Sequence, residues 1–297
     1  MEQMKKVLVL GCKGMAGHVI MTYLERLETY DIWGIARDVK HESNIISLDI
    51  SNIKELESIL NKGCFDVVIN CIGLLNDTAE NNPELAIWFN SYFPHLLTCF
   101  GKKYSFKFIH ISTDCVFSGR EGGYKEDSFK NGIGFYAQSK ALGEIINSKD
   151  LTFRTSIIGP ELKNNGIGLF HWFMNQNNEI SGFSEVYWSG VTTIELAKGI
   201  HEAINQDLTG LYHFVNNSKV SKFDLLQEFN DHFRGGEINI MSKSDYGVDK
   251  SLVNTRSDFV YNFSSYQTMI KEMKNWISDY SDLYKHYSTQ EHYNKLN

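Results

Sequence analysis

The first half of the chain alternates short apolar runs with longer segments whose apolar residues recur every three or four positions. Residues 7–10 form an apolar run that ends at Gly11, and residues 15–28 form the first of the longer segments. Short runs of β-forming residues predict buried strands, and the three-to-four spacing predicts amphipathic helices. By the same criteria we predict further strands at 31–36, 45–48, 66–70, 106–112 and 151–155, and helices at 53–60, 83–103 and 135–147.

Strands and helices that alternate in this way predict a parallel sheet covered by helices on both faces. The expected fold class is therefore α/β, with a Rossmann doubly wound parallel sheet. Pro94 lies inside the helix predicted at 83–103. It should bend or interrupt that helix, because proline lacks the N–H group that an inner turn needs.

Beyond residue 158 the alternation weakens, and residues 159–190 become rich in Asn, Gly and aromatic side chains. The pattern then predicts helices at 193–205, 221–233 and 265–284 and a strand at 210–215. No repeat or flexible linker separates these segments from the first half. We therefore expect a Rossmann domain over 1–158, to which 191–217 returns, and a smaller interwoven C-terminal substrate lobe made of 159–190 and 218–297.

Composition narrows the class of protein. A formal charge of −7 over 297 residues argues against a nucleic-acid partner, which would require clustered Lys and Arg. Five scattered cysteines are typical of reduced thiols in a cytoplasmic protein. The longest apolar stretch, 67–75, is too short to span a membrane. No histidine pair has the spacing of a metal site, so we expect no metal; a homodimer is left open.

A glycine-rich turn follows the first predicted strand and opens the first predicted helix. Such a turn lets backbone N–H groups approach a pyrophosphate at the positive end of the helix. The spacing G-x-x-G-x-x-G is looser than the usual dinucleotide fingerprint, but its place at the first strand–helix junction favours nucleotide binding. The predicted cofactor residues here are Gly11, Lys13, Gly14, Met15 and Gly17.

The second predicted strand ends at Arg37, where an NAD-binding protein usually places an acidic residue. An arginine would instead neutralise a 2′-phosphate, so we expect NADPH as the cofactor. The acidic Asp38 follows immediately, and NADH therefore remains an alternative. Strand ends further along the chain add five candidates: Asp49 and Ile50 for the adenine, and Cys71, Ile72 and Gly73 for the nicotinamide ribose.

Tyr136 and Lys140 lie four residues apart on a predicted helix and therefore share one face. An ammonium group near a phenol favours the phenolate and should lower its pKa, which makes Tyr a usable acid–base group. Thr113 ends the predicted strand at 106–112. Because ligands of such sheets bind at the carboxyl ends of strands, Thr113 should hydrogen-bond the oxygen that Tyr136 protonates.

These motifs resemble those of the extended short-chain dehydrogenases/reductases, and within them the dTDP-4-dehydrorhamnose reductase branch. The resemblance rests on 11–17, 112–119, 123–127 and 136–144. It implies a cytoplasmic oxidoreductase of deoxysugar biosynthesis for cell-surface polysaccharide, which reduces the 4-keto carbon of a nucleotide-linked 6-deoxy sugar with a nicotinamide cofactor. It also implies that Tyr136 donates the proton, Lys140 holds the nicotinamide ribose, Thr113 orients the carbonyl and Asp114 contacts the substrate.

The chain departs from that family at positions expected to shape the sugar pocket. Cys115 stands where the family usually has Tyr, and Ala137 where it has Gly. Lys250 and Arg256 remain suited to a diphosphate, and Trp188 is an aromatic residue that would stack on a base or sugar. The sequence therefore leaves two substrates open: dTDP-4-dehydrorhamnose and a UDP-4-keto-6-deoxy-N-acetylhexosamine.

Two other functions share these motifs. An epimerase or 4,6-dehydratase would keep NAD tightly bound, but a dehydratase of this superfamily has Glu in the position of Cys115. A regulatory subunit would bind NADP without catalysis, and the intact Tyr136–Lys140 pair argues against it.

Overall fold

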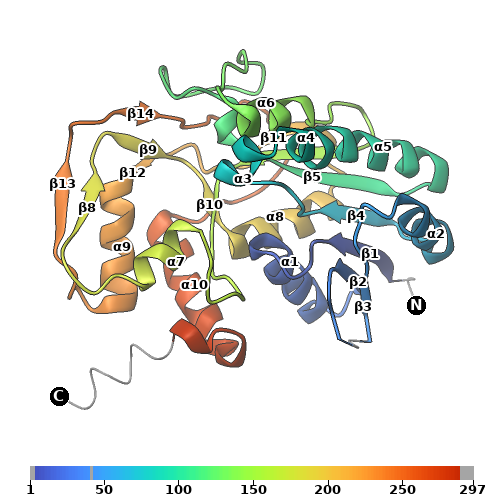
Figure 1. The fold of residues 1–297 in the computed structure, drawn as a ribbon, viewed down its shortest axis with the longest axis horizontal. Coiled ribbons are helices and arrows are strands. Elements are labelled where there is room, and N and C mark those ends of the chain that lie inside the picture. The colour runs from blue at the N-terminus through green and yellow to red at the C-terminus, as the bar shows by residue number, and fades with distance from the viewer. Residues whose placement is uncertain (1–3, 41–42, 288–297) are drawn as a thin grey trace.

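The computed structural model describes residues 4–40 and 43–287, and its centre is a seven-stranded parallel sheet. The strand order β11-β6-β5-β4-β1-β2-β3 confirms the expected Rossmann-type α/β fold (Figure 1). Its strands are β1 (Lys5–Leu10), β2 (Tyr30–Ala36), β3 (Ile45–Ser47), β4 (Val67–Asn70), β5 (Lys107–Thr113), β6 (Leu151–Thr155) and β11 (Gly210–His213).

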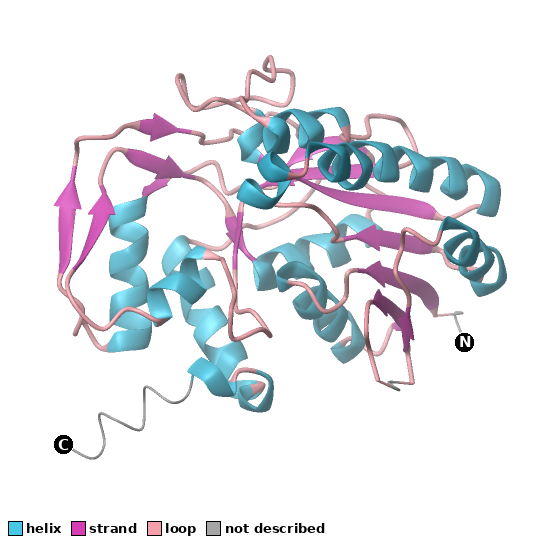
Figure 2. Ribbon diagram, in the orientation of Figure 1, coloured by secondary structure: helices cyan, strands magenta, loops and turns pink. Residues whose placement is uncertain are grey.

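Helices cover both faces of this sheet (Figure 2). Successive side chains of a strand point to opposite faces, so Val7 and Val9 enter one hydrophobic core and Leu8 and Leu10 the other. All four are fully buried, and each such side chain stabilises the fold by about 1.5–3 kcal/mol. The first core is closed by α1 (Met15–Arg26) and α8 (Thr193–Asn205), the second by α2 (Ile53–Gly63) and α5 (Phe93–Tyr104).

The helix predicted at 83–103 is interrupted, as expected, although the interruption precedes Pro94. The chain runs from α3 (Asn76–Asn81) into α4 (Pro83–Ala86), widens into a π-helical segment, η1 (Ile87–Tyr92), and continues as α5. Pro94 has no N–H to donate to the carbonyl of Asn90, four residues earlier. That carbonyl instead lies against Gly143, where an added Cβ would approach its oxygen to 1.8 Å.

The helix α6 (Phe135–Leu142) ends five residues before the predicted boundary at 147, so that prediction was wrong in its length. Gly143 closes the helix by donating its N–H to the carbonyls of Ser139 and Lys140. The chain then turns toward β6, where Ile145 donates its backbone N–H to Thr152 Oγ1 at 3.1 Å. Close packing against η1 thus limits the helix to the turns that hold Tyr136 and Lys140.

A smaller lobe stands beside the carboxyl ends of the main strands, at the left of Figure 1. The helix α9 (Lys222–Arg234) begins after Ser221, whose Oγ caps it by accepting from Asp224 N at 3.0 Å. Among the described residues, every helix is too short or too polar to span a membrane.

The elements that follow β6, apart from α8 and β11, are β7 (Ile157–Ile158), α7 (Leu169–Met174), β8 (Ile180–Phe183), β9 (Val186–Trp188), β10 (Val191–Thr192), β12 (Val220–Ser221), α9 (Lys222–Arg234), β13 (Ile240–Lys243), β14 (Val248–Asp249) and α10 (Tyr266–Asp279).

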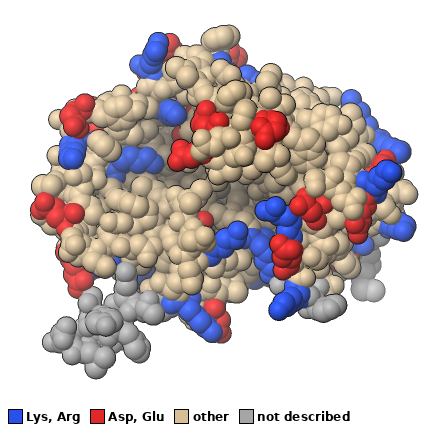
Figure 3. All heavy atoms as spheres, viewed as in Figure 1, with Lys and Arg blue, Asp and Glu red and all other residues tan. Residues whose placement is uncertain are grey.

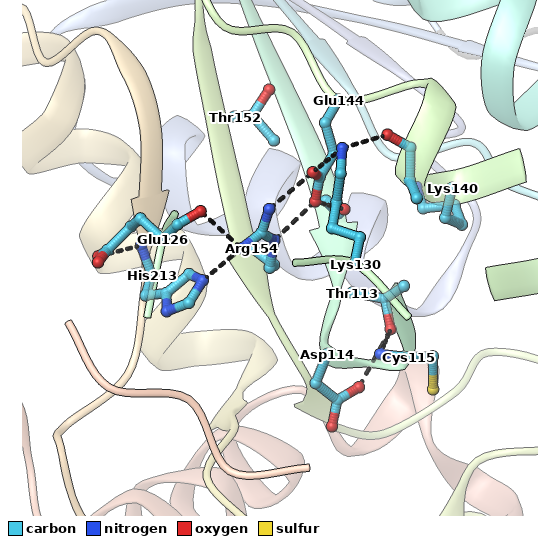
Figure 4. Close-up of polar contacts among 12 residues, drawn as sticks. Thr113, Asp114, Cys115, Glu126, Lys130, Lys140, Glu144, Thr152, Arg154 and His213 are labelled. Atoms are coloured by element: carbon cyan, nitrogen blue, oxygen red, sulfur yellow. Dashed lines mark hydrogen bonds and ion pairs between the residues drawn. The ribbon is translucent and has the colours of Figure 1, made fainter. Parts of the chain in front are cut away.

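A buried ion pair joins the end of α6 to the sheet (Figure 4). Arg154 on β6 donates to both carboxylate oxygens of Glu144, each at 2.7 Å. Ser112 Oγ on β5 and Lys130 Nζ complete the donors to this carboxylate, at 2.7 Å and 3.0 Å. Arg154 also donates to His213 Nε2 on β11 at 2.7 Å. Four donor groups around one buried carboxylate fix the helix relative to three strands.

We expect Arg154→Met to lower the free energy of unfolding by about 3–5 kcal/mol, because it leaves the Glu144 carboxylate buried without its main cation. Lys103→Met breaks an exposed pair with Glu57 and should cost far less, since water screens such pairs. Urea denaturation measures both variants. Equal losses of unfolding free energy in the two variants would show that the buried pair stabilises the fold no more than the exposed pair does.

Candidate active site

Parallel strands bring the predicted site residues to one edge of the sheet, because their carboxyl ends all point the same way. Gly11 follows β1, and the segment 71–73 follows the neighbouring β4. Cys71 donates its N–H to the Leu10 carbonyl at 3.0 Å, and a Cβ added to Gly11 would approach Ile72 Cγ1 to 2.8 Å. The turn after β1 and the turn after β4 therefore lie in contact.

The glycine turn has the geometry that a pyrophosphate site requires. Gly11 has a φ of +77°, a backbone conformation that favours glycine. A Cβ at Gly17 would lie 2.2 Å from the Gly11 carbonyl oxygen, so α1 packs against the turn only because no side chain intervenes. Gly14 precedes α1 in an extended conformation, and Lys13 and Met15 flank it. The first N–H groups of α1 thus open onto the turn.

Arg37 and Asp49 face each other at the ends of β2 and β3. Their closest atoms, Arg37 Nη1 and Asp49 Oδ2, are 3.9 Å apart, and the Arg37 side chain is 71% exposed. Hydrogen bonds from Ser51, and then the Arg37 charge, lower the pKa of Asp49. Ile50 is 4% exposed and its side chain belongs to the hydrophobic core, which leaves only its backbone to contact a cofactor.

Tyr136 and Lys140 lie on α6, and Tyr136 lines a cavity of about 350 Å³. Burial raises the pKa of the Tyr136 phenol, and the Thr113 hydroxyl lowers it. Lys140 Nζ donates to the Ile111 carbonyl at 2.7 Å. Burial lowers the pKa of Lys140 to about 8 against the opposing charge of Glu144. Among the described residues Lys140 therefore does not lower the Tyr136 pKa as expected, because its ammonium group donates to a carbonyl of β5 instead.

Thr113 organises the short 3-10 helix that follows β5, η2 (Asp114–Val116). Its Oγ1 donates to Asp114 Oδ1 and accepts from Cys115 N, both at 3.1 Å. Burial raises the pKa of Asp114, while Lys250 and Lys222 lower it. Burial also raises the pKa of Cys115 to about 11. The thiol therefore stays protonated and lines the cavity, which fits its expected role as part of the pocket wall.

The three other predicted substrate contacts have different positions. Lys250 lines the cavity and approaches Cys115 Sγ to 3.5 Å. Trp188 is 3% exposed and packs into the hydrophobic core, so its ring does not form the cavity wall. Arg256 is not brought to the site. Its Nη1 donates to the Thr209 and Leu211 carbonyls at the amino end of the edge strand β11, and Asp258 pairs with its charge.

Two residues of the site had no signal in the sequence. The Glu80 carboxylate accepts the backbone N–H groups of Phe135 and Tyr136, each at 3.0 Å, and so caps α6. Asn90, in the π-helical η1, bonds both backbone groups of Leu74 and donates to Ser139 Oγ on α6. Both residues bond to partners far away in the sequence, and such contacts cannot be predicted from motif spacing or hydrophobic periodicity.

Residues 4–274 match the family model described as RmlD substrate binding domain. The chain belongs to this family. A relative in Haloferax volcanii, named a probable low-salt glycan biosynthesis reductase, is 24% identical over 249 residues, which are 80% of this chain and 82% of the relative. The dTDP-4-dehydrorhamnose reductase of Aggregatibacter actinomycetemcomitans is 26% identical over 237 residues, which cover 74% and 76% of the two chains.

Solved structures share the fold of this RmlD-family chain. The dTDP-4-dehydrorhamnose reductase from Bacillus anthracis, solved in complex with NADP, superposes with a TM-score of 0.78 at 22% identity, over 92% of this chain and 98% of that one. A hypothetical dTDP-4-dehydrorhamnose reductase from Sulfolobus tokodaii gives 0.71 at 25% identity, over 83% and 91% of the chains. The sheet and lobe are thus arranged as in these proteins.

We expect Glu80→Ala to reduce kcat by about 10-fold or more, since loss of its cap lets α6 shift the Tyr136 hydroxyl and small misplacements are costly. Cofactor affinity should change little, because the glycine turn is untouched. Glu84→Ala, a neighbouring exposed carboxylate, is the matched control. Steady-state kinetics that give equal kcat values for both variants would contradict the capping role.

Proposed function

We propose that this RmlD-family protein uses NADPH to reduce the 4-keto group of a nucleotide-linked 4-keto-6-deoxy sugar. The observation that carries the proposal is the meeting of Thr113, Tyr136 and Lys140 at the edge of the sheet where the glycine turn lies. The names of the relatives support it, since they are reductases, and one neighbour with the same fold was solved with NADP.

The residues present fit a dinucleotide. Gly11 and Gly17 let the turn after β1 pack directly against the turn after β4 and against α1, and the start of α1 would supply backbone N–H groups to the pyrophosphate. The exposed Arg37 would bind a 2′-phosphate, while NADH would forgo that contact. Gly73 lies near the Lys140 ammonium, 3.9 Å from the position of an added Cβ, so this end of the site suits the nicotinamide ribose. When bound, NADPH supplies the hydride that reduces the carbonyl carbon.

Tyr136 would act as the proton donor. Burial raises the pKa of its phenol, so the free protein holds the proton that the reaction consumes. As hydride adds to the carbonyl carbon, negative charge develops on the oxygen, and the phenol proton passes to that oxygen. Thr113 would hold the carbonyl oxygen toward Tyr136 by donating to it the hydroxyl proton that Asp114 Oδ1 accepts in the free protein. The phenolate that remains would regain its proton from solvent. The Lys140 ammonium, whose charge Glu144 favours against burial, would hold the nicotinamide ribose.

The cavity wall bears on the choice of sugar. Cys115 and Ala137, two of the positions at which the chain departs from the resembled family, both line the cavity beside Tyr136. We propose dTDP-4-dehydrorhamnose as the first substrate to test, because it appears in the relatives' names. A UDP-4-keto-6-deoxy-N-acetylhexosamine is the second, since the Cys115 thiol leaves more room than a tyrosine would. A dehydratase is disfavoured because this thiol, with a pKa of about 11, replaces a carboxylate.

Tyr136→Phe should lower kcat by about 100-fold or more, as expected when a positioned proton donor is removed. Binding of NADPH should remain nearly unchanged, because the glycine turn is intact. The measurement is loss of NADPH absorbance with each 4-keto nucleotide sugar. Tyr246→Phe, which removes an exposed hydroxyl from the lobe, should behave like the wild type.

Two results would contradict the proposed reaction. Reduction that survives in Tyr136→Phe would remove the proton donor from the mechanism. Conversion of a nucleotide sugar without added NADPH would favour an epimerase or dehydratase that recycles a tightly bound cofactor.

Arg37→Ala should weaken NADPH binding by about 10-fold or more, the usual value of a hydrogen bond to a charged group. NADH binding to the same variant is the internal control and should change little, because NADH has no 2′-phosphate. Fluorescence titration with both cofactors measures the ratio. An equal effect on the two cofactors would mean that Arg37 does not read the 2′-phosphate.

A further inference from the structure

Lys222 lies next to the candidate active site, although nothing in its sequence context singles it out. It is the first residue of α9, directly after β12. Its ammonium lies 5.5 Å from the centre of the Trp188 ring and acts electrostatically on Asp114. The small sheet β12-β9-β14 explains this position. Ser221 of β12 and Asp249 of β14 both pair with Tyr187 of β9. Lys222 and Lys250, the next residues along the chain, therefore flank the same strand, and both act electrostatically on Asp114.

The Lys222 ammonium has no hydrogen-bond or ion-pair partner within residues 4–40 and 43–287. Other lysines of the chain are paired, for example Lys198 with Glu272 at 2.6 Å and Lys219 with Asp249 at 2.5 Å. Burial lowers the pKa of Lys222 against the opposing charge of Asp114. A cation at the first turn of a helix is also unfavourable to the helix dipole. The partly buried Lys222 ammonium thus has the Trp188 ring and the charge of Asp114 near it but no direct acceptor among the described residues.

The charges around Asp114 do not balance. One buried carboxylate lies near two lysines, Lys222 and Lys250, and the only hydrogen bond recorded for Lys250 Nζ within the described residues is to Cys115 Sγ. Both lysines are partly buried, and a partly buried cation gains from an additional anionic partner. Figure 3 shows this face of the molecule hollowed near its centre, with atoms of both basic and acidic residues at the edge of the hollow. An anionic group bound beside Asp114 would give both ammonium groups a direct partner.

The proposed substrate carries such a group in the right place. In a 4-keto nucleotide sugar the reacting C4 lies across the ring from C1, which bears the diphosphate. If Thr113 and Tyr136 hold the C4 oxygen, the diphosphate must lie about one sugar ring away, next to the loop of Asp114. Lys222 and Lys250 lie near that loop. Arg256, which the sequence also suggested as a diphosphate ligand, is held at the far end of β11.

We propose that Lys222 binds the diphosphate of the nucleotide sugar together with Lys250, with Trp188 as the platform that holds the Lys222 side chain in place. The inference rests on the proposed function for the identity of the substrate. The geometry itself requires only a phosphorylated ligand, so the site can be tested without the reaction.

The test uses Lys222→Met, which keeps the length of the side chain and removes the charge. Calorimetric titration of the purified protein with UDP and dTDP, and with uridine and thymidine, separates binding of the phosphates from binding of the base. We expect the diphosphates to bind about 10- to 100-fold more weakly to the variant, as for loss of a charged hydrogen bond. Nucleoside binding should be unchanged, and Lys243→Met, an exposed lysine of the same lobe, should match the wild type.

Stability and kinetics distinguish a binding role from a structural one. Without ligand, Lys222→Met should have a Tm equal to or above that of the wild type, because the substitution breaks no hydrogen bond or ion pair among the described residues and removes a partly buried charge. With substrate, KM should rise while kcat and NADPH affinity stay close to the wild type. Lys222→Arg, which keeps the charge, should restore most of the diphosphate affinity.

The other possible outcomes also test the proposed diphosphate site. Unchanged diphosphate affinity in Lys222→Met, or a Tm well below the wild type, would overturn the inference, even if the wild type reduces a 4-keto sugar. Failure of the wild type to bind UDP and dTDP would overturn it as well. Charge-dependent diphosphate binding without any reduction would support the phosphate site and reject the proposed reaction instead.

Discussion

The Glu144 carboxylate, buried at the end of α6, joins the catalytic helix to the sheet. Donors from β5, β6 and the loop before α6 surround it, and Arg154 extends the contact to His213 on β11. A buried carboxylate is tolerated only when such donors are all in place, so α6 has one favourable position. The same charge helps to keep Lys140 protonated. The place of Tyr136 in the cavity therefore depends on this carboxylate as much as on α6 itself.

Two kinds of charged group lie around the active site, one fully buried and paired, the other partly buried and without a direct partner among the described residues. Glu144 and Arg154 satisfy each other within the fold and hold it together. Lys222 and Lys250 face Asp114 without forming an ion pair among the described residues. The paired charges stabilise the fold, whereas the two lysines beside Asp114 are the groups that we propose for ligand binding. The net charge of −7 gave no sign of these two cations.

Much of the fold could be predicted because the signals are local. The runs at 7–10 and 67–69 are apolar on both faces of the strand, a pattern typical of a parallel sheet covered by helices on both sides. Parallel strands then bring Gly11, Cys71 and Thr113 to one edge without further information. The length of α6 was predicted wrongly because Gly143 ends it against Asn90, a residue more than fifty positions earlier. Likewise, the cations of 250–256 looked equivalent, yet only Lys250 reaches the cavity.

The sequence by itself determined the parallel α/β sheet, the glycine turn and the Tyr136–Lys140 face, since each depends on residues within one or two turns of the chain. Only the tertiary structure decided the cap by Glu80, the bridge by Asn90 and the position of Lys222. These contacts join residues tens of positions apart, and which of them meet follows from how helices and strands pack. A charge has a functional role or a structural one according to whether that packing gives it a partner.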